Sequence, residues 1–259
     1  PEPEVDTSLF DIISEWTQLG QDIDGEQQAG EATWGGNTVS LSSDGTIVAI
    51  GAANNEGDSG DYGIGHVRVY KYREFTNNDV DNYNYGSFTQ DTNETLPIIV
   101  TNTVPSEGNY YWFQLGVDID DFEDYAYSGY SVSLSSDGTI VAIGAPSDQS
   151  DVNGGVELYE SGFVRVYQYS NGSWTKLGQD IDGEAGGDQS GTSLSLSSDG
   201  TVVAIGAYNN AENGVQSGHV RVYQYNGTIW TQLGNDIDGE AQYDRSGNSV
   251  SLSSDGTIV

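Results

Sequence analysis

The chain lacks cysteine and methionine and carries few cationic side chains, and each shortage excludes a class of protein. Without cysteine there are no disulfides, no thiol chemistry and no cysteine-ligated zinc. Only 7 Lys and Arg residues stand against 40 Asp and Glu residues, which gives a formal net charge of −33. A polyanion of this kind repels phosphate backbones and anionic lipid head groups. We therefore expect no binding to nucleic acid and no attachment to anionic membranes.

Long apolar runs are also missing, and histidine is rare. No stretch approaches the roughly 18 apolar residues that would cross a bilayer, so membrane insertion is not expected. The two histidines, His66 and His219, are too few for a histidine-rich metal site. Glycine, in contrast, is abundant, with 35 residues among 259. Because the usual share is about 7%, this abundance predicts many short strands and turns.

The sequence contains an internal repeat. A string beginning Val-Ser-Leu-Ser-Ser-Asp-Gly and ending Ala-Ile-Gly-Ala occupies residues 39–52, returns at 132–145 and 194–207, and begins again at Val250. Its aspartate is spaced by 93, 62 and 56 residues from copy to copy, so the unit has about 56 residues, with insertions in the earlier copies. Two further strings recur with it, His-Val-Arg-Val-Tyr from residue 66 and a tryptophan-led string from residues 16, 112, 174 and 230. Such periodicity is typical of modular repeat folds.

Each unit is predicted to form four short strands. Val-Ser-Leu-Ser is followed by Ser-Asp-Gly, a turn signal, and then by a continuous apolar run that fits a buried strand. The third strand is rich in β-branched and aromatic residues, and the fourth runs from the tryptophan through Asp-Ile-Asp. Asn171-Gly172 and Asn226-Gly227 lie between the third and fourth strands, where a tight hairpin favours Asn-Gly. No segment shows sustained helical periodicity.

Four antiparallel strands repeated every 40 to 60 residues are typical of a β-propeller. A β-solenoid is the alternative, but its coils are usually shorter and lack repeated hairpins. We predict an all-β chain that forms a β-propeller of four-stranded antiparallel blades, with about four blades' worth of sequence. Residues 1–14 would be a leader or linker, residues 15–259 the repeats, and residues 73–111 an insertion.

The repeat resembles a known family. The string from Ser133 to Pro146, followed by Gly-Phe-Val-Arg-Val-Tyr at 162–167, is similar to FG-GAP-type repeats, which build the propellers of integrin α-subunit heads and of many secreted proteins. That resemblance implies a propeller at the cell surface and a calcium-binding turn between the first two strands. Here Ser40, Ser42 and Asp44 fill the ligand positions, and an apolar residue stands where the final carboxylate would be. We expect the calcium site to be lost from this turn.

Two expectations concern the ends of the chain. Because the sequence has no initiator methionine, we expect a processed product or a segment of a longer protein. The copy that begins at Val250 stops inside its second strand, which would leave ladder groups unpaired. We therefore expect the natural chain to continue beyond residue 259, or to pair there with another segment. A four-blade ring closed by residues 1–20 beside residues 250–259 is the alternative.

The acidic pentad Asp-Ile-Asp-Gly-Glu recurs at the end of each unit. In a strand its two aspartates share one face, about 7 Å apart, and with the glutamate they supply the oxygen ligands that calcium prefers. This pattern predicts calcium ligands, although an acidic loop that only keeps the surface solvated remains the alternative. The candidate ligands are Asp22, Asp24, Glu26, Asp118, Asp120, Asp180, Asp182, Glu184, Asp236, Asp238 and Glu240. Because these carboxylates recur in every unit, we do not expect them to form a catalytic acid–base pair.

Three of the few arginines occupy one repeat position. Neighbouring blades would cover Arg68, Arg165 and Arg221, so each guanidinium needs a carboxylate partner. Placing Tyr225 opposite Trp230 brings Arg221 near Asp236, and the same alignment brings Arg165 near Asp180. We predict an Arg–Asp bridge between strands in each blade. The alternative is a ligand funnel lined by arginine.

Several residues outside the repeat pattern are candidates for surface contacts. The recurring tryptophans are expected to pack between blades, whereas Trp34 lies outside the pattern and is a candidate contact. The insertion is rich in Asn, Asp and Tyr, and we predict partner contacts there at Tyr83 and Tyr85. His66 and His219 share a position with Phe163, so they are expected to pack rather than to bind metal. Three sequons predict glycosylation, at Asn93, Asn171 and Asn226.

The repeats are uniform and contain no singular catalytic cluster, which favours a function without catalysis. We predict an extracellular or cell-surface scaffold that serves adhesion or the assembly of a larger structure, stabilised by calcium. Its partner would be a protein or glycan at the cell surface, with self-assembly or further propeller blades as another kind of partner. A carbohydrate-binding module is the alternative, and an enzyme whose active site lies elsewhere in a longer chain is a third.

Overall fold

The computed structural model describes residues 16–23, 38–54, 63–80, 82–86, 98–101, 103–120, 126–147 and 161–259. These residues form strands, turns and one short 3₁₀ helix, η2 (Asn77–Asp79), with no α-helix among them. The strands are β1 (Thr38–Leu41), β2 (Ile47–Ala52), β3 (His66–Glu74), β4 (Asn84–Gly86), β5 (Ile98–Val100), β6 (Tyr110–Gln114), β7 (Ile119–Asp120), β8 (Ser131–Leu134), β9 (Ile140–Ala145), β10 (Phe163–Ser170), β11 (Ser173–Lys176), β12 (Ile181–Asp182), β13 (Ser193–Leu196), β14 (Val202–Ala207), β15 (His219–Tyr225), β16 (Trp230–Gln232) and β17 (Ile237–Asp238).

Three sheets share one plan, and each corresponds to one copy of the repeat. In the first sheet β1, β2, β3 and β6 are neighbours in that order; β8 to β11 form the second, and β13 to β16 the third. All pairings between these strands are antiparallel, as predicted. The predicted alignment of Tyr225 with Trp230 is confirmed in the third sheet. The chain is therefore all-β in its described part, with antiparallel sheets.

The predicted fourth strand is divided in two. After β6, β11 and β16 the chain turns at a glycine with positive φ, and the Ile-Asp pair then forms a short strand (β7, β12 or β17) on the beginning of the same long strand. Gly178, for example, has a φ of 73°, and its equivalents Gly116 and Gly234 have φ values of 74° and 72°. Such a conformation strains residues with a Cβ, so glycine permits the turn. The acidic pentads are thus placed at one end of each sheet.

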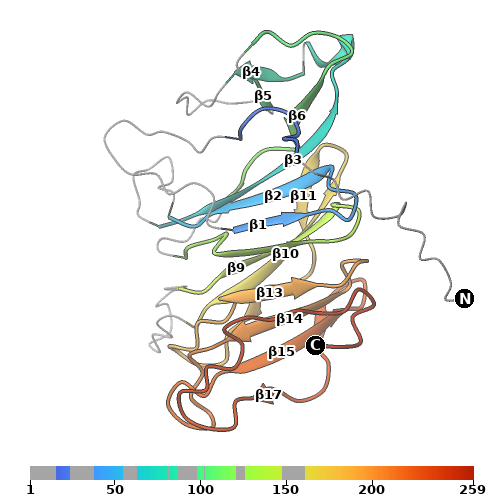
Figure 1. Cartoon of the computed structure of the whole chain (residues 1–259). Helices are drawn as coiled ribbons and strands as arrows, with labels where there is room; N and C mark the ends of the chain where they lie inside the picture. Colours follow the sequence, from blue (N-terminus) through green and yellow to red (C-terminus); the bar gives the residue numbers. More distant parts are fainter. Residues whose placement is uncertain are drawn as a thin grey trace, which may run out of the picture.

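The sheets stack face to face through repeated contacts (Figure 1). Apolar side chains from adjacent sheets form common clusters, such as Val67 and Val69 with Val141 and Ile143. A serine of each first strand accepts a hydrogen bond from the backbone of the next copy: Leu134 N lies 2.9 Å from Ser40 Oγ, and the contact repeats at Leu196 and Leu252. Burial of these faces removes apolar surface that a single sheet would leave in water.

Tryptophans link the outer strands of adjacent sheets. The indole nitrogen of Trp230 donates to the carbonyl of Leu177, and Trp174 donates in the same way to Leu115. Trp112 makes this bond to Leu19, which belongs to the copy before the first sheet. The predicted packing role is confirmed for Trp112, Trp174 and Trp230, and it is wrong for Trp16, because among the described residues no preceding copy offers Trp16 a carbonyl acceptor. Trp16 is 98% exposed.

The insertion contains ordered strands in addition to loop. β5 pairs with β6, and β4 pairs with β5 in parallel, so the first sheet is wider than the others. Phe75, Ile99, Tyr111 and Phe113 form a small core of its own, against which Tyr83 packs. The run Leu-Pro-Ile-Ile-Val at 96–100 contributes its three β-branched residues to β5.

Candidate functional site

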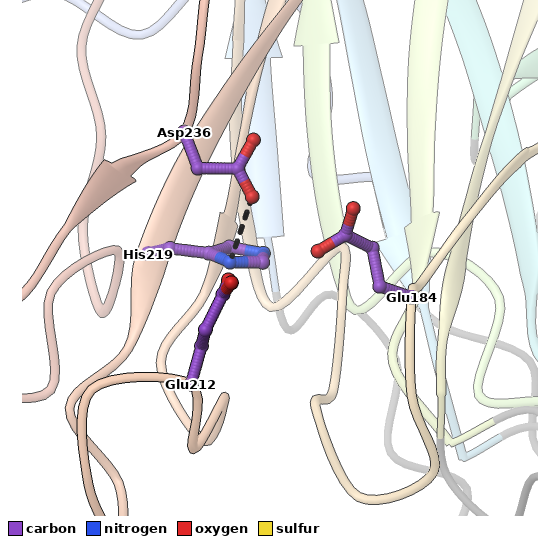
Figure 2. Close-up of side chains that lie close together, drawn as sticks. All are labelled: Glu184, Glu212, His219 and Asp236. Carbon is purple, nitrogen blue, oxygen red and sulfur yellow. Dashed lines mark ion pairs between the residues drawn. The ribbon is translucent and has the colours of Figure 1, made fainter.

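Four side chains that can ligate a metal gather at one end of the third sheet. They are Glu184, Glu212, His219 and Asp236, and one donor atom from each lies within 4.8 Å of the others. Figure 2 shows the three carboxylates arranged around the imidazole of His219. A mixed set of carboxylate and imidazole donors is suited to a divalent metal ion.

His219 forms the buried floor of the site. It begins β15, its side chain is 1% exposed, and neither ring nitrogen has a hydrogen-bond partner. The nearest carboxylate oxygen is Asp236 Oδ2, 3.5 Å from Nδ1. A buried polar group without a partner costs about 1–3 kcal/mol, so this imidazole is in an unfavourable state unless something binds it.

The other members come from three connections. Asp236 directly precedes β17, which pairs with the beginning of β15 and so brings the carboxylate over His219. Its Oδ1 accepts a hydrogen bond from Gln232 Nε2 at 2.5 Å, which leaves Oδ2 directed at the ring. Glu184 follows β12 of the second sheet, and Glu212 lies in the connection between β14 and β15. The site therefore spans two sheets.

Buried polar contacts hold the connection that carries Glu212. Asn210 is 5% exposed; its side-chain oxygen accepts a bond from the Glu212 backbone, and its amide donates to Asp188 at 3.1 Å. Asp188 is itself 3% exposed and also accepts from the backbone of Ala185, next to Glu184. The two glutamates are thus anchored to the same polar core, although they belong to different sheets.

Arg221 corrects one sequence prediction. Arg221 does not bridge to Asp236: its Nη2 donates to the carbonyl oxygen of Asp182 at 2.7 Å, and its Nη1 lies 3.3 Å from Glu184. The physical reason is that these two acceptors of the second sheet lie next to Arg221 on β15. Asp236, in turn, already accepts a hydrogen bond from Gln232. The cluster consequently contains three carboxylates and one guanidinium, a formal charge of −2 with neutral imidazole.

The other two arginines do bind the aspartate of their own sheet. Arg165 Nη2 lies 2.9 Å from Asp180, as predicted, and Arg68 binds both oxygens of Asp118. Burial alone would raise the pKa of Asp118 and Asp180, but the hydrogen bonds and charge of these arginines outweigh it and hold both pKa values below the ordinary range. These two carboxylates are occupied by cations of the protein.

The predicted calcium ligands are therefore distributed among different roles. Glu184 and Asp236 enter the cluster around His219, and Asp118 and Asp120 lie near His66 in a smaller group. Asp180 is bound by Arg165 and by Lys176 Nζ at 2.6 Å. Asp182, Asp238 and Glu240 are exposed, Asp22 accepts from Gln18, and Asp24 and Glu26 lie outside the described residues.

The turns between the first two strands use their aspartates as hydrogen-bond acceptors. Asp44 Oδ1 accepts from Ser42 Oγ at 2.7 Å and from the backbone and side chain of Thr46. These bonds, led by that of the Thr46 backbone, lower the pKa of Asp44 to about 2. The same contacts recur at Asp137, Asp199 and Asp255. This carboxylate thus closes the turn, in the position where the family resemblance implies a calcium ligand.

The remaining candidates for binding fall outside this cluster. Tyr83 is half-buried and packs edge to face on Phe113, with a centroid distance of 5.2 Å, so one ring face is used internally. Tyr85 belongs to β4, while Trp34 and Asn93 lie outside the described residues. Asn171 and Asn226 are exposed in turns, and their glycosylation stays a prediction.

Sequence reasoning missed two members of the cluster. His219 was assigned to packing because Phe163 replaces it in another copy, and Glu212 lies in a connection without any repeated motif. The signal that could have found His219 was the difference between histidine here and phenylalanine at the equivalent Phe163. A histidine at this position brings a nitrogen donor to the acidic end of its sheet. Nothing in the sequence indicated Glu212, because its approach depends on how the β14–β15 connection folds.

Comparison with known proteins does not assign the chain to a family. No protein-family model and no curated protein matches it. Among solved structures it is similar to hydrazine synthase from Kuenenia stuttgartiensis, with a TM-score of 0.41 and 13% identity over 90% of this chain, which spans 44% of that one. A putative 6-phosphogluconolactonase from Bacteroides uniformis gives a TM-score of 0.36 and 11% identity, covering 81% of this chain and 73% of that chain. A chain of the mitotic checkpoint complex gives a TM-score of 0.28 and 13% identity, covering 91% and 93%.

Sequence identity is 13% or less and the TM-score 0.41 or less in all three comparisons, and the resemblance to FG-GAP repeats stays a prediction. In the described part of the chain, no helix has the length and apolar character needed to cross a membrane.

Proposed function

We propose that the chain is a non-enzymatic β-propeller scaffold, extracellular or at the cell surface, that serves adhesion or the assembly of a larger structure. Each four-stranded sheet would be one blade, and the FG-GAP-type resemblance agrees with that assignment. The observation that carries the proposal is the uniform stacking of successive sheets. A scaffold requires rigid packing that repeats, and the same kinds of contact join each sheet to the next.

Stacking uses the same atoms in every copy. First strands are joined by serine hydroxyls, and outer strands by tryptophan-to-carbonyl bonds, so both sides of the sheet are fixed to its neighbour. A close approach of backbones accompanies them: a Cβ on Gly206 would lie 2.0 Å from the carbonyl oxygen of Gly247, and on Gly144 it would lie 2.2 Å from that of Gly191. Most repeated positions are thereby assigned to packing.

The first sheet presents an apolar face that other copies bury. Val39 and Leu41 are 66% and 59% exposed, whereas the equivalent Val132 and Leu134 are 9% and 7% exposed. Exposed apolar side chains at positions otherwise used for stacking are favourable sites for a further blade or another protein surface. This agrees with self-assembly or additional blades as partners of the chain.

The test is the clustering of beads coated with residues 1–259 in the presence of calcium, the ion that the acidic pentads are predicted to bind. We expect clusters in millimolar calcium that disperse on chelation. Magnesium at matched ionic strength is the control, since simple screening of the net charge would also favour association. Beads that stay dispersed in every ion, together with a monomer in sedimentation, would refute the assembly role. Small-angle scattering of the same chain checks the propeller, because a closed ring and a linear stack differ in maximum dimension.

A carbohydrate-binding role is not favoured by the described residues. Trp112, Trp174 and Trp230 donate to backbone carbonyls between sheets, so their rings serve packing. Trp34, the candidate for sugar contact, lies outside the described part. If the chain bound glycans on an array and Trp34→Ala abolished that binding, the carbohydrate-binding function would be favoured over the scaffold function.

A further inference from the structure

We propose that Glu184, Glu212, His219 and Asp236 form a site for one divalent transition-metal ion, with zinc as its representative, that ties the second sheet to the third. The site goes beyond the scaffold function and does not depend on it. Two independent observations support it: four donors within 4.8 Å of one another, and a buried imidazole whose nitrogens have no hydrogen-bond partner.

Donor chemistry selects the class of ion. Calcium and magnesium prefer all-oxygen sites, whereas an imidazole nitrogen favours zinc and its first-row neighbours. Three carboxylates with one imidazole complete four protein ligands, the number found in structural zinc sites. The site is therefore assigned a structural role, bracing two sheets.

Charge balance supports a dication. The carboxylates of Glu184, Glu212 and Asp236 carry −3, and the adjacent guanidinium of Arg221 carries +1, so neutral His219 leaves −2. A divalent ion neutralises this charge, whereas without it three carboxylates repel one another around a buried ring. Glu184 and Glu212 are exposed, so water screens part of that repulsion.

The geometry needs only a small contraction. In a tetrahedral zinc site with bonds of about 2.1 Å, ligand atoms are about 3.4 Å apart. His219 and Asp236 already show 3.5 Å between Nδ1 and Oδ2. The two glutamates have long exposed side chains that can close the remaining distance while their backbones stay anchored through Asn210 and Asp188. Gln232 fixes Asp236 as an outer partner, a role common to metal sites.

The other copies lack this combination. The second sheet has Phe163 in place of His219, and its Asp180 is held by Arg165 and Lys176. In the first sheet, Asp118 near His66 is held by Arg68. At the aspartate position shared by the three sheets, Asp118 and Asp180 are held by an arginine, whereas Asp236 accepts from the neutral amide of Gln232.

The experiment is calorimetric titration of residues 1–259 with zinc chloride. We expect one site, no measurable binding in His219→Phe, and affinity reduced about tenfold or more in Glu212→Gln. Phe163 shows that the repeat accommodates phenylalanine at this position, so His219→Phe is expected to fold. His66→Phe and Glu240→Gln are matched controls that should bind like the parent.

Cobalt provides a second readout, because its visible absorption reports nitrogen ligation and coordination number. The parent should give a four-coordinate spectrum that zinc removes and that calcium in large excess does not. Absence of zinc binding, zinc affinity unchanged in both His219→Phe and Glu212→Gln, or calcium competing as well as zinc would each overturn the proposal. The last result would assign the cluster to calcium.

Discussion

The second and third sheets have nearly the same sequence and the same strand order, yet their acidic ends differ in chemistry. In the second, Arg165 and Lys176 neutralise Asp180. In the third, Gln232 replaces the lysine, Arg221 turns to Glu184, and Asp236 faces the imidazole of His219. The comparison teaches that stacking positions are common to the copies, whereas a few changes at the end of a sheet convert an ion-paired site into a candidate metal centre.

The largest expected effect comes from the tryptophans that join the sheets. Trp230 is 3% exposed, and Trp230→Ala should lower the free energy of unfolding by about 3–5 kcal/mol, because it leaves a cavity and removes the bond to Leu177. Trp174→Ala should cost less, since Trp174 is only half-buried. Urea denaturation measures all three variants, with the 98% exposed Trp16→Ala as the control that should leave stability unchanged. Equal losses in all three would contradict the stacking role.

Converting the second sheet toward the third is the next test. Phe163→His places an imidazole in a position that is 2% exposed, and we expect a loss of about 2 kcal/mol because its nitrogens lack partners. Zinc should not restore the lost stability, because Asp180 is already held by two cations. Thermal unfolding with chelator and with zinc checks this. Rescue by zinc would show that the histidine alone determines metal binding.

The reverse substitution, His219→Phe, should change the free energy of unfolding in opposite directions in chelator and in zinc. In chelator, His219→Phe removes a buried group without a hydrogen-bond partner, and we expect it to raise the free energy of unfolding by about 1 kcal/mol. In zinc the parent should become the more stable protein, since an ion bound only by the folded state stabilises it. Chemical denaturation in the two buffers measures the difference. A variant that is less stable in both buffers would show that His219 serves packing alone.

The smallest effect concerns the turns that all copies share. The pKa of Asp44 is about 2, below its ordinary value of 3.8, because Thr46 and Ser42 donate to the carboxylate. A lowered pKa contributes stability above the unfolded value, and that contribution is lost as the pH falls from about 4 toward 2. Ser42→Ala should raise the pKa of Asp44 toward 3.8, as followed by NMR of the carboxyl carbon. An unchanged pKa would assign the shift to the backbone and side-chain bonds from Thr46.

The repeated elements could be predicted from sequence because their signals are local. Apolar runs and Ser-Asp-Gly turns gave β2, β9 and β14 with their antiparallel neighbours, and Asn171-Gly172 gave a two-residue hairpin. The break in the fourth strand was missed, since only the folded sheet shows that the glycine after each leucine turns the chain back to the long strand.

The candidate site could be predicted only in part. The pentads indicated an acidic end, and two of their members, Glu184 and Asp236, do lie in the cluster. The partner of Arg221 was predicted within its own sheet, but the closer acceptors belong to the sheet before it, and contacts between repeats leave no pattern within one copy. Glu212 was missed because its position depends on how the β14–β15 connection folds, and His219 because Phe163 takes its place in another copy.

The most direct test of the account is the number of zinc ions bound by residues 1–259, counted by native mass spectrometry. The account predicts one zinc ion for the parent, one for His66→Phe and none for His219→Phe. No zinc on the parent, several ions distributed over the acidic ends, or one ion retained by His219→Phe would contradict the claim that the third sheet alone holds the site.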